Sequence, residues 1–148
     1  MPRRAATIGY RLAQLGAVGT ALGGAGDTLV PKLLPHHETF LGVAPGGASP
    51  ATVALILMLL HTLGAALFAV GVGALALLAA WRRGGGRSSA IVAAIVVVLA
   101  EGTNALAIRR VGSLLFLWPV ACALLAAGGV AIVAGWGVRS LPGAGSAR

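Results

Sequence analysis

Long apolar runs separated by short polar clusters dominate the pattern of this chain. A helix needs roughly 20 apolar residues to cross the hydrocarbon core of a bilayer, and four of the runs are long enough. Prolines and basic, Gly-rich clusters mark the breaks: Pro31 ends the first run, Pro50 precedes the second, and "RRGGGR" and "RRVGS" separate the later ones. The pattern predicts four membrane-spanning helices, at about residues 8–30, 51–81, 89–108 and 113–136.

Composition supports the same class. Of 148 residues, 58% are hydrophobic and only 9% are charged, and the mean hydropathy is +0.96, which is typical of membrane proteins. We therefore predict an all-α fold, an integral membrane four-helix bundle that forms one domain over residues 1–148. The content of Ala, Gly and Arg with a single Lys is typical of a GC-rich bacterial genome, so we expect a multi-pass protein of a bacterial plasma membrane.

The net charge of +8 predicts an orientation rather than a nucleic-acid partner. The basic residues fall in short clusters between apolar runs, and no aromatic or RNP-like motif accompanies them. With the N-terminus in the cytoplasm, eight basic residues lie inside and three outside, which favours two cytoplasmic termini. The inner set is Arg3, Arg4, Arg11, Arg82, Arg83, Arg87, Arg139 and Arg148, and the outer set is Lys32, Arg109 and Arg110.

The first segment also has the basic start and apolar middle of a secretory signal, with small residues near Ala25 that resemble a cleavage site. Its Gly-rich packing pattern, shared with the other segments, favours a retained helix. The outer connection, residues 31–50, is bounded by prolines and is predicted to be a loop. Its apolar "TFLGV" stretch indicates an ordered loop that caps the bundle or enters the headgroup layer.

Small and polar residues share faces on three of the predicted helices. Lipid does not drive helices together by apolar burial, so close backbone packing and polar contacts must do so. We expect each of these faces to meet a neighbouring helix. They comprise Gly16, Thr20, Gly23, Gly24 and Asp27 on the first helix, His61, Gly64, Ala65, Phe68 and Val72 on the second, and Ala90, Ala93, Ala94, Val97, Glu101 and Asn104 on the third.

Two features of the fourth helix concern packing. Trp118-Pro119 is expected to remove one backbone hydrogen bond and to bend the outer third of this helix. Cys122, the single cysteine, makes no intramolecular disulfide and is interpreted as a small core residue.

The candidate site is a polar cluster of Asp27, His61, Glu101 and Asn104. At 1.5 Å per residue, Glu101 lies near the bilayer middle, and the other three lie further out. The four residues are expected to form a funnel from the outer surface down to Glu101. An ionisable group at such depth usually faces the interior and has a partner, so the cluster is predicted to bind a ligand or carry a proton. The alternative is that Glu101 and Asn104 only hold helices together by hydrogen bonds.

The outer loop contains "HHE", residues His36, His37 and Glu38. Metal binding, capping of a ligand and an ordinary polar loop are the three interpretations. Neighbours in an extended chain point to opposite sides, and no spaced motif such as H-E-x-x-H is present, so we predict no metal site here. No nucleophile elbow, P-loop, dinucleotide fingerprint or Cys pair occurs, and the sequence identifies neither catalytic residues nor a cofactor.

Two stretches resemble the DoxX-like group of small four-helix membrane proteins. "RLAQLGAVGTALGGAGDTLVP", residues 11–31, is similar to the Gly-rich first helix of that group, which closes on a proline. "HTLGAALFAVGVGALALLAAW", residues 61–81, is similar to its second helix, and the resemblance covers about residues 8–136. Members serve as membrane subunits or accessory proteins of redox systems, or have no known function. The resemblance implies a fold more than an activity.

Three function hypotheses follow. In the leading one, the protein is a non-catalytic binding or accessory subunit, embedded in the lipid bilayer, whose outer-half pocket takes a hydrophobic small molecule, a lipid or a membrane-protein partner. In the second, it is a proton-coupled small transporter or channel, with a homo-oligomer placing Glu101 at its centre. In the third, it is a membrane redox subunit or enzyme using His61 with Glu101, or the His36-His37-Glu38 loop.

Overall fold

A computed structural model describes residues 2–135, and every regular element in this part of the chain is helical. The end of the fourth predicted segment at residue 136, together with Arg139 and Arg148, lies outside the described residues. The elements are α1 (Pro2–Thr28), α2 (Pro35–Leu41), α3 (Pro50–Arg82), α4 (Arg87–Arg110), the 3-10 turn η1 (Leu114–Phe116) and α5 (Leu117–Gly135).

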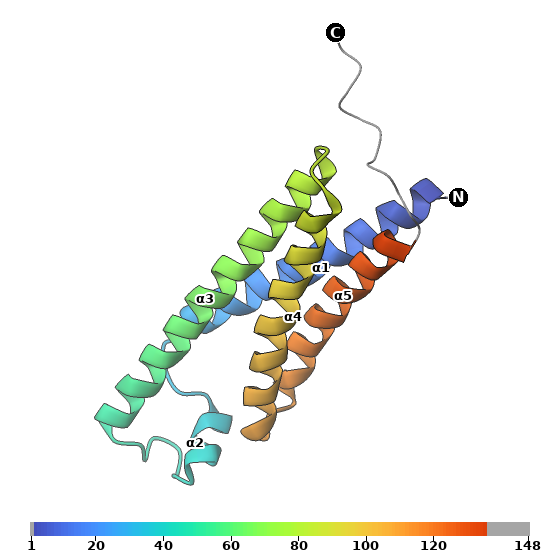
Figure 1. Cartoon of the computed structure of the whole chain (residues 1–148). Coiled ribbons are helices and arrows are strands. Elements are labelled where there is room, and N and C mark those ends of the chain that lie inside the picture. Colours follow the sequence, from blue (N-terminus) through green and yellow to red (C-terminus); the bar gives the residue numbers. More distant parts are fainter. Residues whose placement is uncertain (1, 136–148) are drawn as a thin grey trace.

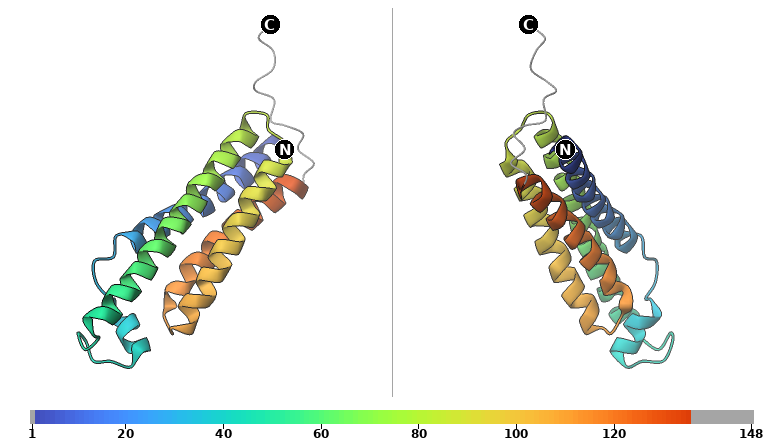
Figure 2. Two further views of the ribbon diagram at one scale, coloured as in Figure 1. Left: turned by 60° about the vertical axis from the view of Figure 1, so that its left-hand side comes forward. Right: turned by 90° about the vertical axis from the view of Figure 1, so that its right-hand side faces the viewer.

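The long helices run alternately down and up, and they pack as an elongated bundle (Figure 1). α1 contacts α3 on one side and α5 on the other, and α4 completes the bundle between α3 and α5. The N-terminus and the α3–α4 turn lie at one end, and α2 and the α4–η1 turn lie at the other (Figure 2). We call these the terminal end and the α2 end.

Three helical stretches are long and apolar enough to cross a membrane: α3, α4, and η1 with α5 from Leu114 to Ala134. This confirms the all-helical class and the presence of long apolar helices. α1, with 27 residues, is also long enough, but its composition is more polar. A fourth span and the side on which the termini lie therefore stay predictions.

α1 and α3 approach most closely where glycines bring their two backbones together. A Cβ atom on Gly64 would lie 2.5 Å from the backbone nitrogen of Thr28 and 2.6 Å from the carbonyl oxygen of Gly24. Further along, a Cβ on Gly71 would lie 2.5 Å from the nitrogen of Ala21. Side chains cannot occupy these positions, so glycine is what allows the two backbones to touch.

α1 approaches α5 in the same way on its other side. A Cβ on Gly129 would lie 2.5 Å from both the nitrogen of Ala13 and the carbonyl oxygen of Gly9. A Cβ on Gly16 would lie 2.7 Å from the carbonyl oxygen of Cys122. α1 therefore lies between α3 and α5, with a Gly-rich contact on each side.

The packed hydrophobic core fills the terminal half of the bundle. Its members are mainly alanines, with Leu78, Val97 and Val133 as larger residues. Tyr10 and Trp81 close the core, with ring centroids 5.7 Å apart, and the Arg82 guanidinium lies 5.6 Å from the centroid of the Tyr10 ring. Small side chains in this half draw the helices together, whereas the α2 half is less closely filled.

The three helices differ in how well the predicted faces match the residues that are buried. All six residues of the α4 face are buried, as predicted. On α3, Gly64 is buried, but Ala65, Phe68 and Val72 are exposed; the prediction for these three was wrong because the buried face follows Leu67, Gly71, Ala74 and Leu78. On α1, the single predicted face divides, because Gly16 and Gly23 approach α5 and Gly24 approaches α3.

The predicted boundaries of α3 and α4 lie close to the observed ones, but α1 begins earlier than predicted, at Pro2. The connection 31–50 is not all loop, because it contains α2. Pro119 does not bend the outer third of a longer helix. It lies in the first turn of α5, directly after η1, where a backbone N–H has no intrahelical partner to lose.

Candidate functional site

A cavity of about 420 Å³ lies in the α2 half of the bundle, between α3 and α4. Pockets of about 300–1,000 Å³ are typical of small-molecule sites. We call it the α2-end cavity. Its lining residues are Asp27, Val30 and Leu34 from the end of α1 and the connection after it, His36, His37, Phe40 and Leu41 from α2, Ile56, Leu59, Leu60 and Leu63 from α3, and Asn104, Ala107, Ile108, Val111 and Leu115 from α4 and the turn after it.

The α2-end cavity is mainly apolar with few polar groups. Asp27, half-buried near the end of α1, and Asn104, only 9% exposed on α4, come from two different helices. His36 and His37 contribute polar rings from α2. An apolar wall with a few polar groups is the usual design of a small-molecule site.

Glu101 lies one helical turn from Asn104 on the buried face of α4 and is only 1% exposed. Its Oε2 atom has no hydrogen-bond partner among the described residues. Asp27 lines the same cavity as Asn104, which lies one turn from Glu101 on α4, so the two carboxyl groups lie in the same part of the bundle. Within residues 4–134, no basic side chain forms an ion pair with either carboxylate.

The structure therefore brings Asp27 and Asn104 to one cavity and places Glu101 near them, but it does not place His61 there. His61 is partly buried, and its Nε2 atom lies 2.8 Å from the carbonyl oxygen of Val30. It does not line the α2-end cavity. His61 instead connects α3 to the segment just after α1, so it positions this segment.

The "HHE" residues form part of α2 and make local contacts. The Nδ1 atom of His37 accepts a hydrogen bond from the Leu34 N–H at 3.2 Å, and Oε1 of Glu38 accepts one from the Gly46 N–H at 2.8 Å. The rings of His36 and His37 lie 4.1 Å apart. The described residues contain no group of three or more His, Cys, Asp or Glu side chains able to hold a metal ion.

His37 gives α2 a pH dependence. Burial first, and then the neighbouring His36, lower the pKa of His37 from its ordinary value of 6.5. The folded α2 thus binds fewer protons than the unfolded segment, so its stability is present above pH 6.5 and falls as the pH drops through the lowered pKa. A protonated Nδ1 also cannot accept the hydrogen bond from Leu34.

We expect hydrogen-exchange protection of residues 35–41, corrected for intrinsic rates, to be lower at pH 5 than at pH 7.5. His37→Asn keeps an acceptor near Leu34 but does not titrate, so its α2 protection should change little over this range. Equal protection of wild-type α2 at both pH values would show that His37 does not control this helix.

Sequence reasoning missed most of the cavity wall. Leu59 and Leu63 are exposed residues of α3 outside the predicted face, and Phe40 belongs to a helix that was predicted as a loop. The "TFLGV" stretch gave the one usable signal, since apolar residues in an outer loop indicate a cap. Cys122, predicted to be a core residue, is buried on α5 against Gly19 of α1.

Comparison with protein-family models, curated proteins and solved structures gave no match to this chain. The resemblance to the DoxX-like group therefore stays a prediction, and the function is argued from the site alone.

Proposed function

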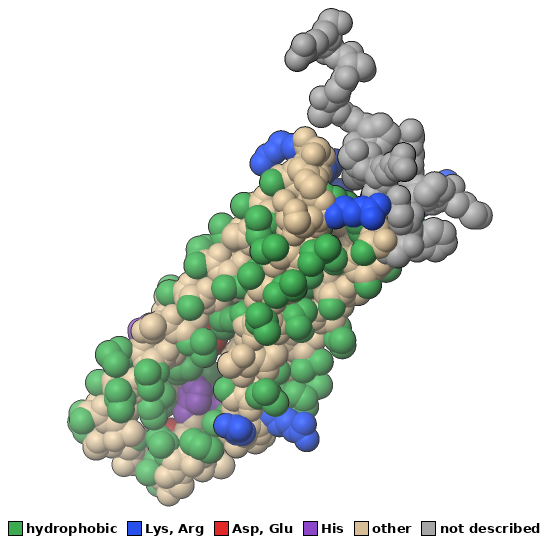
Figure 3. All heavy atoms as spheres, in the orientation of Figure 1, with side chains coloured by type: hydrophobic (Ala, Val, Ile, Leu, Met, Phe, Trp, Pro, Cys, Tyr) green, Lys and Arg blue, Asp and Glu red, His purple; other side chains and the backbone are tan. Residues whose placement is uncertain are grey.

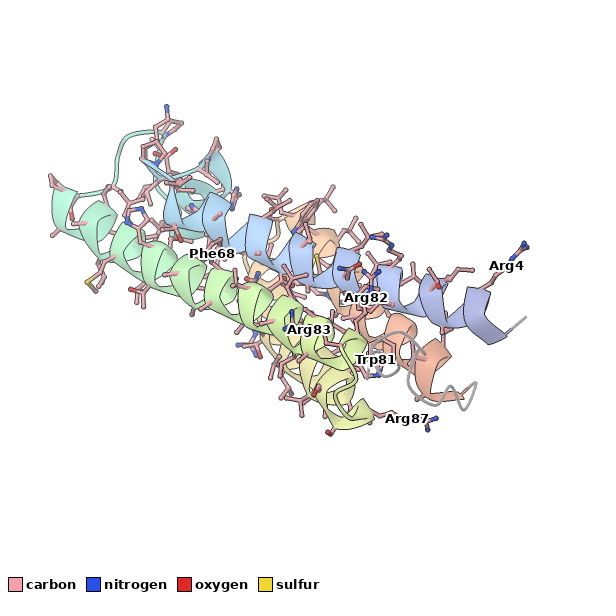
Figure 4. The ribbon with its side chains drawn as sticks, turned by 90° about the horizontal axis from the view of Figure 1, so that it is seen from above. Arg4, Phe68, Trp81, Arg82, Arg83 and Arg87 are labelled. Carbon is pink, nitrogen blue, oxygen red and sulfur yellow. The ribbon has the colours of Figure 1, made fainter. Side chains whose placement is uncertain are left out.

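We propose that α1, α3, α4 and α5 all span a bacterial plasma membrane, with both termini in the cytoplasm and α2 outside. α1 supports a fourth span because it packs between α3 and α5 along its length. Arg4, Arg82, Arg83 and Arg87 lie toward the terminal end of the molecule (Figure 4), which favours that end as the cytoplasmic one.

Reporter fusions test this topology. A fusion after Gly46, in the connection between α2 and α3, should report the outer compartment, and one after Gly85, between α3 and α4, should report the cytoplasm. The opposite pair of results would invert the orientation and place the α2-end cavity on the cytoplasmic side.

We propose further that the protein is a binding or accessory protein whose α2-end cavity holds a hydrophobic small molecule or lipid with a polar head. The cavity itself carries this proposal: a space of about 420 Å³ with apolar walls and with Asp27 and Asn104 on two helices. Apolar walls accommodate a hydrocarbon portion, and the polar pair orients a head group. Nothing in the arrangement requires catalysis.

Exposure of the lining residues supports entry from the side. Phe40 is 60% exposed and Leu59 is 57% exposed although both line the cavity. The surface is hollowed between α3 and α4, and a histidine side chain is visible inside (Figure 3). In the proposed orientation this opening faces the outer half of the bilayer, so a lipid-dissolved molecule reaches the cavity without crossing water.

Native mass spectrometry of protein released from neutral maltoside micelles tests the proposal. We expect one predominant adduct, of the mass of a lipid or a smaller amphiphile, retained at a stoichiometry of one per chain. A protein free of adducts, or one carrying a broad series of loosely bound lipids, would contradict a defined binding site.

Proton-coupled transport is the second candidate, favoured by one observation. Glu101 is buried with an unpartnered Oε2 atom and lies near Asp27, an arrangement suited to the exchange of a proton for a cation. In proteoliposomes, transport predicts that Glu101→Gln abolishes proton-coupled flux while the protein stays folded. Flux that is unchanged in the variant would end this hypothesis.

A further inference from the structure

We propose that the head group recognised in the α2-end cavity is a cationic nitrogen, so that the ligand is an alkyl amine or alkylammonium amphiphile. This inference rests on the proposed binding function and specifies its ligand. Three features of the described residues carry it: the sign of the charge at the cavity, the burial of Glu101, and the apolar character of the remaining wall.

The cavity wall contains one acidic side chain, Asp27, and no Lys or Arg; His36 and His37 are its other titratable side chains. Lys32, Arg109 and Arg110 are exposed at the α2 end, and none forms an ion pair with Asp27 or Glu101. A carboxylate in a low-dielectric setting without a basic partner favours a cation that enters beside it.

Glu101, which does not line the cavity, adds to the preference for a cationic ligand. It is 1% exposed, its Oε2 atom has no partner among residues 4–134, and it interacts electrostatically with Asp27. When either side chain carries a negative charge, a cation next to Asp27 is favoured beside it. A neutral head group gains only hydrogen bonds here, and an anionic one is repelled.

The wall favours an organic cation over a metal ion. A metal ion prefers several oxygen, nitrogen or sulfur ligands, and the described residues contain no group of three His, Cys, Asp or Glu side chains placed to hold one. Ile56, Leu60 and Leu63 line the cavity instead, with Asp27 and Asn104 as the polar groups beyond α2. A cationic nitrogen on an alkyl chain matches both the apolar wall and the polar group, because the chain lies against the leucines and the nitrogen lies next to Asp27.

The test uses three decyl probes with the same photoactivatable diazirine and with trimethylammonium, hydroxyl or sulfonate as head group. They are crosslinked to the whole protein in neutral maltoside micelles, and the labelled peptides are located by mass spectrometry. We expect the ammonium probe to label the segments around Leu59–Leu63 and Ala107–Val111 at roughly tenfold lower concentration than the other probes, as for a charge-assisted contact.

Asp27→Asn should remove this preference, reducing apparent affinity for the ammonium probe by roughly tenfold. Glu38→Gln is the matched control, because it removes one negative charge from α2 at a residue that does not line the cavity. Competition with free decyltrimethylammonium and with phosphatidylethanolamine then distinguishes a free amine from an aminolipid, and either competitor supports the cationic head group.

The outcomes distinguish the claim that the head group is cationic from the claim that the cavity binds a ligand. Equal labelling of the cavity by the ammonium and hydroxyl probes, or preference for sulfonate, overturns the cationic head group but leaves a binding cavity. Cavity labelling by no probe overturns the binding function itself. The selectivity of the wild-type protein among the three probes alone decides whether the head group is cationic. The test is therefore valid even if Asp27→Asn fails to fold.

Discussion

Gly71→Ala is expected to destabilise the bundle by about 1–3 kcal/mol, the usual cost of forcing an extra group into a packed contact. The added Cβ would lie 2.5 Å from the nitrogen of Ala21 and 2.8 Å from the carbonyl oxygen of Ala17. Neither atom belongs to a side chain that can move aside, so α1 and α3 must separate. The midpoint of unfolding in mixed micelles of denaturing and mild detergent measures the effect.

Gly73→Ala is the matched control on the same helix, because no atom beyond the neighbouring backbone of α3 itself lies within 4 Å of the position its Cβ would take. Alanine is a better helix former than glycine by about 0.5–1 kcal/mol, so this variant should be as stable as the wild type or slightly more stable. On α5, Gly129→Ala and Gly128→Ala form a second pair with the same contrast. Equal stability within each pair would show that the glycine contacts do not hold the bundle together.

Ala107→Trp should abolish retention of the bound adduct. Ala107 lines the α2-end cavity, is exposed, and carries no polar side chain. The large indole would occupy the space in which the hydrocarbon portion is proposed to lie, while Asp27, Glu101 and Asn104 stay unchanged. We expect loss of the adduct in native mass spectrometry and an affinity at least about tenfold weaker, equivalent to about 1.4 kcal/mol of binding free energy.

Ala127→Trp on α5 controls for the general effect of an added tryptophan, because Ala127 is also exposed but does not line the cavity. This variant should keep the adduct at wild-type occupancy. If both variants retain the adduct, the ligand lies elsewhere; if both lose it, the tryptophan acts through stability rather than by filling the cavity.

The face of α4 was predictable from the sequence because small and polar residues recur there at helical spacing. Ala90, Val97, Glu101 and Asn104 are all buried, as that spacing indicated. On α3 the same reasoning selected the wrong side beyond Gly64. Small residues occur all round this helix, so their spacing alone could not distinguish the side that meets α1 from the side that is exposed.

The polar cluster was predicted in part. Asp27, Glu101 and Asn104 come together because their depths along α1 and α4, two helices that run in the same direction, match, and such depths can be counted from the sequence. His61 has a similar depth but bonds to Val30, because the direction of a side chain around a helix axis depends on how closely two backbones approach. The close approach at Gly24 and Gly64 sets that direction, and only the structure provides it.

The short helix α2 shows another limit of sequence reasoning. Its hydrogen bonds from Leu34 to His37 and from Gly46 to Glu38 are local, but His37 also lines the α2-end cavity together with residues of the long helices. Seven helical residues are too few to be stable alone. We therefore expect this helix to depend on its flanking segments and on the cavity that it helps to line, and periodicity could not predict it.

A crystal structure grown from a lipidic mesophase tests the central claim most directly, because it shows the cavity and its contents in one measurement. We predict elongated density between α3 and α4, with one end within hydrogen-bonding distance of Asp27 or Asn104 and the rest against Leu60 and Leu63. A bundle in which α3 closes onto α4 and no cavity remains beside Asp27 would contradict the account.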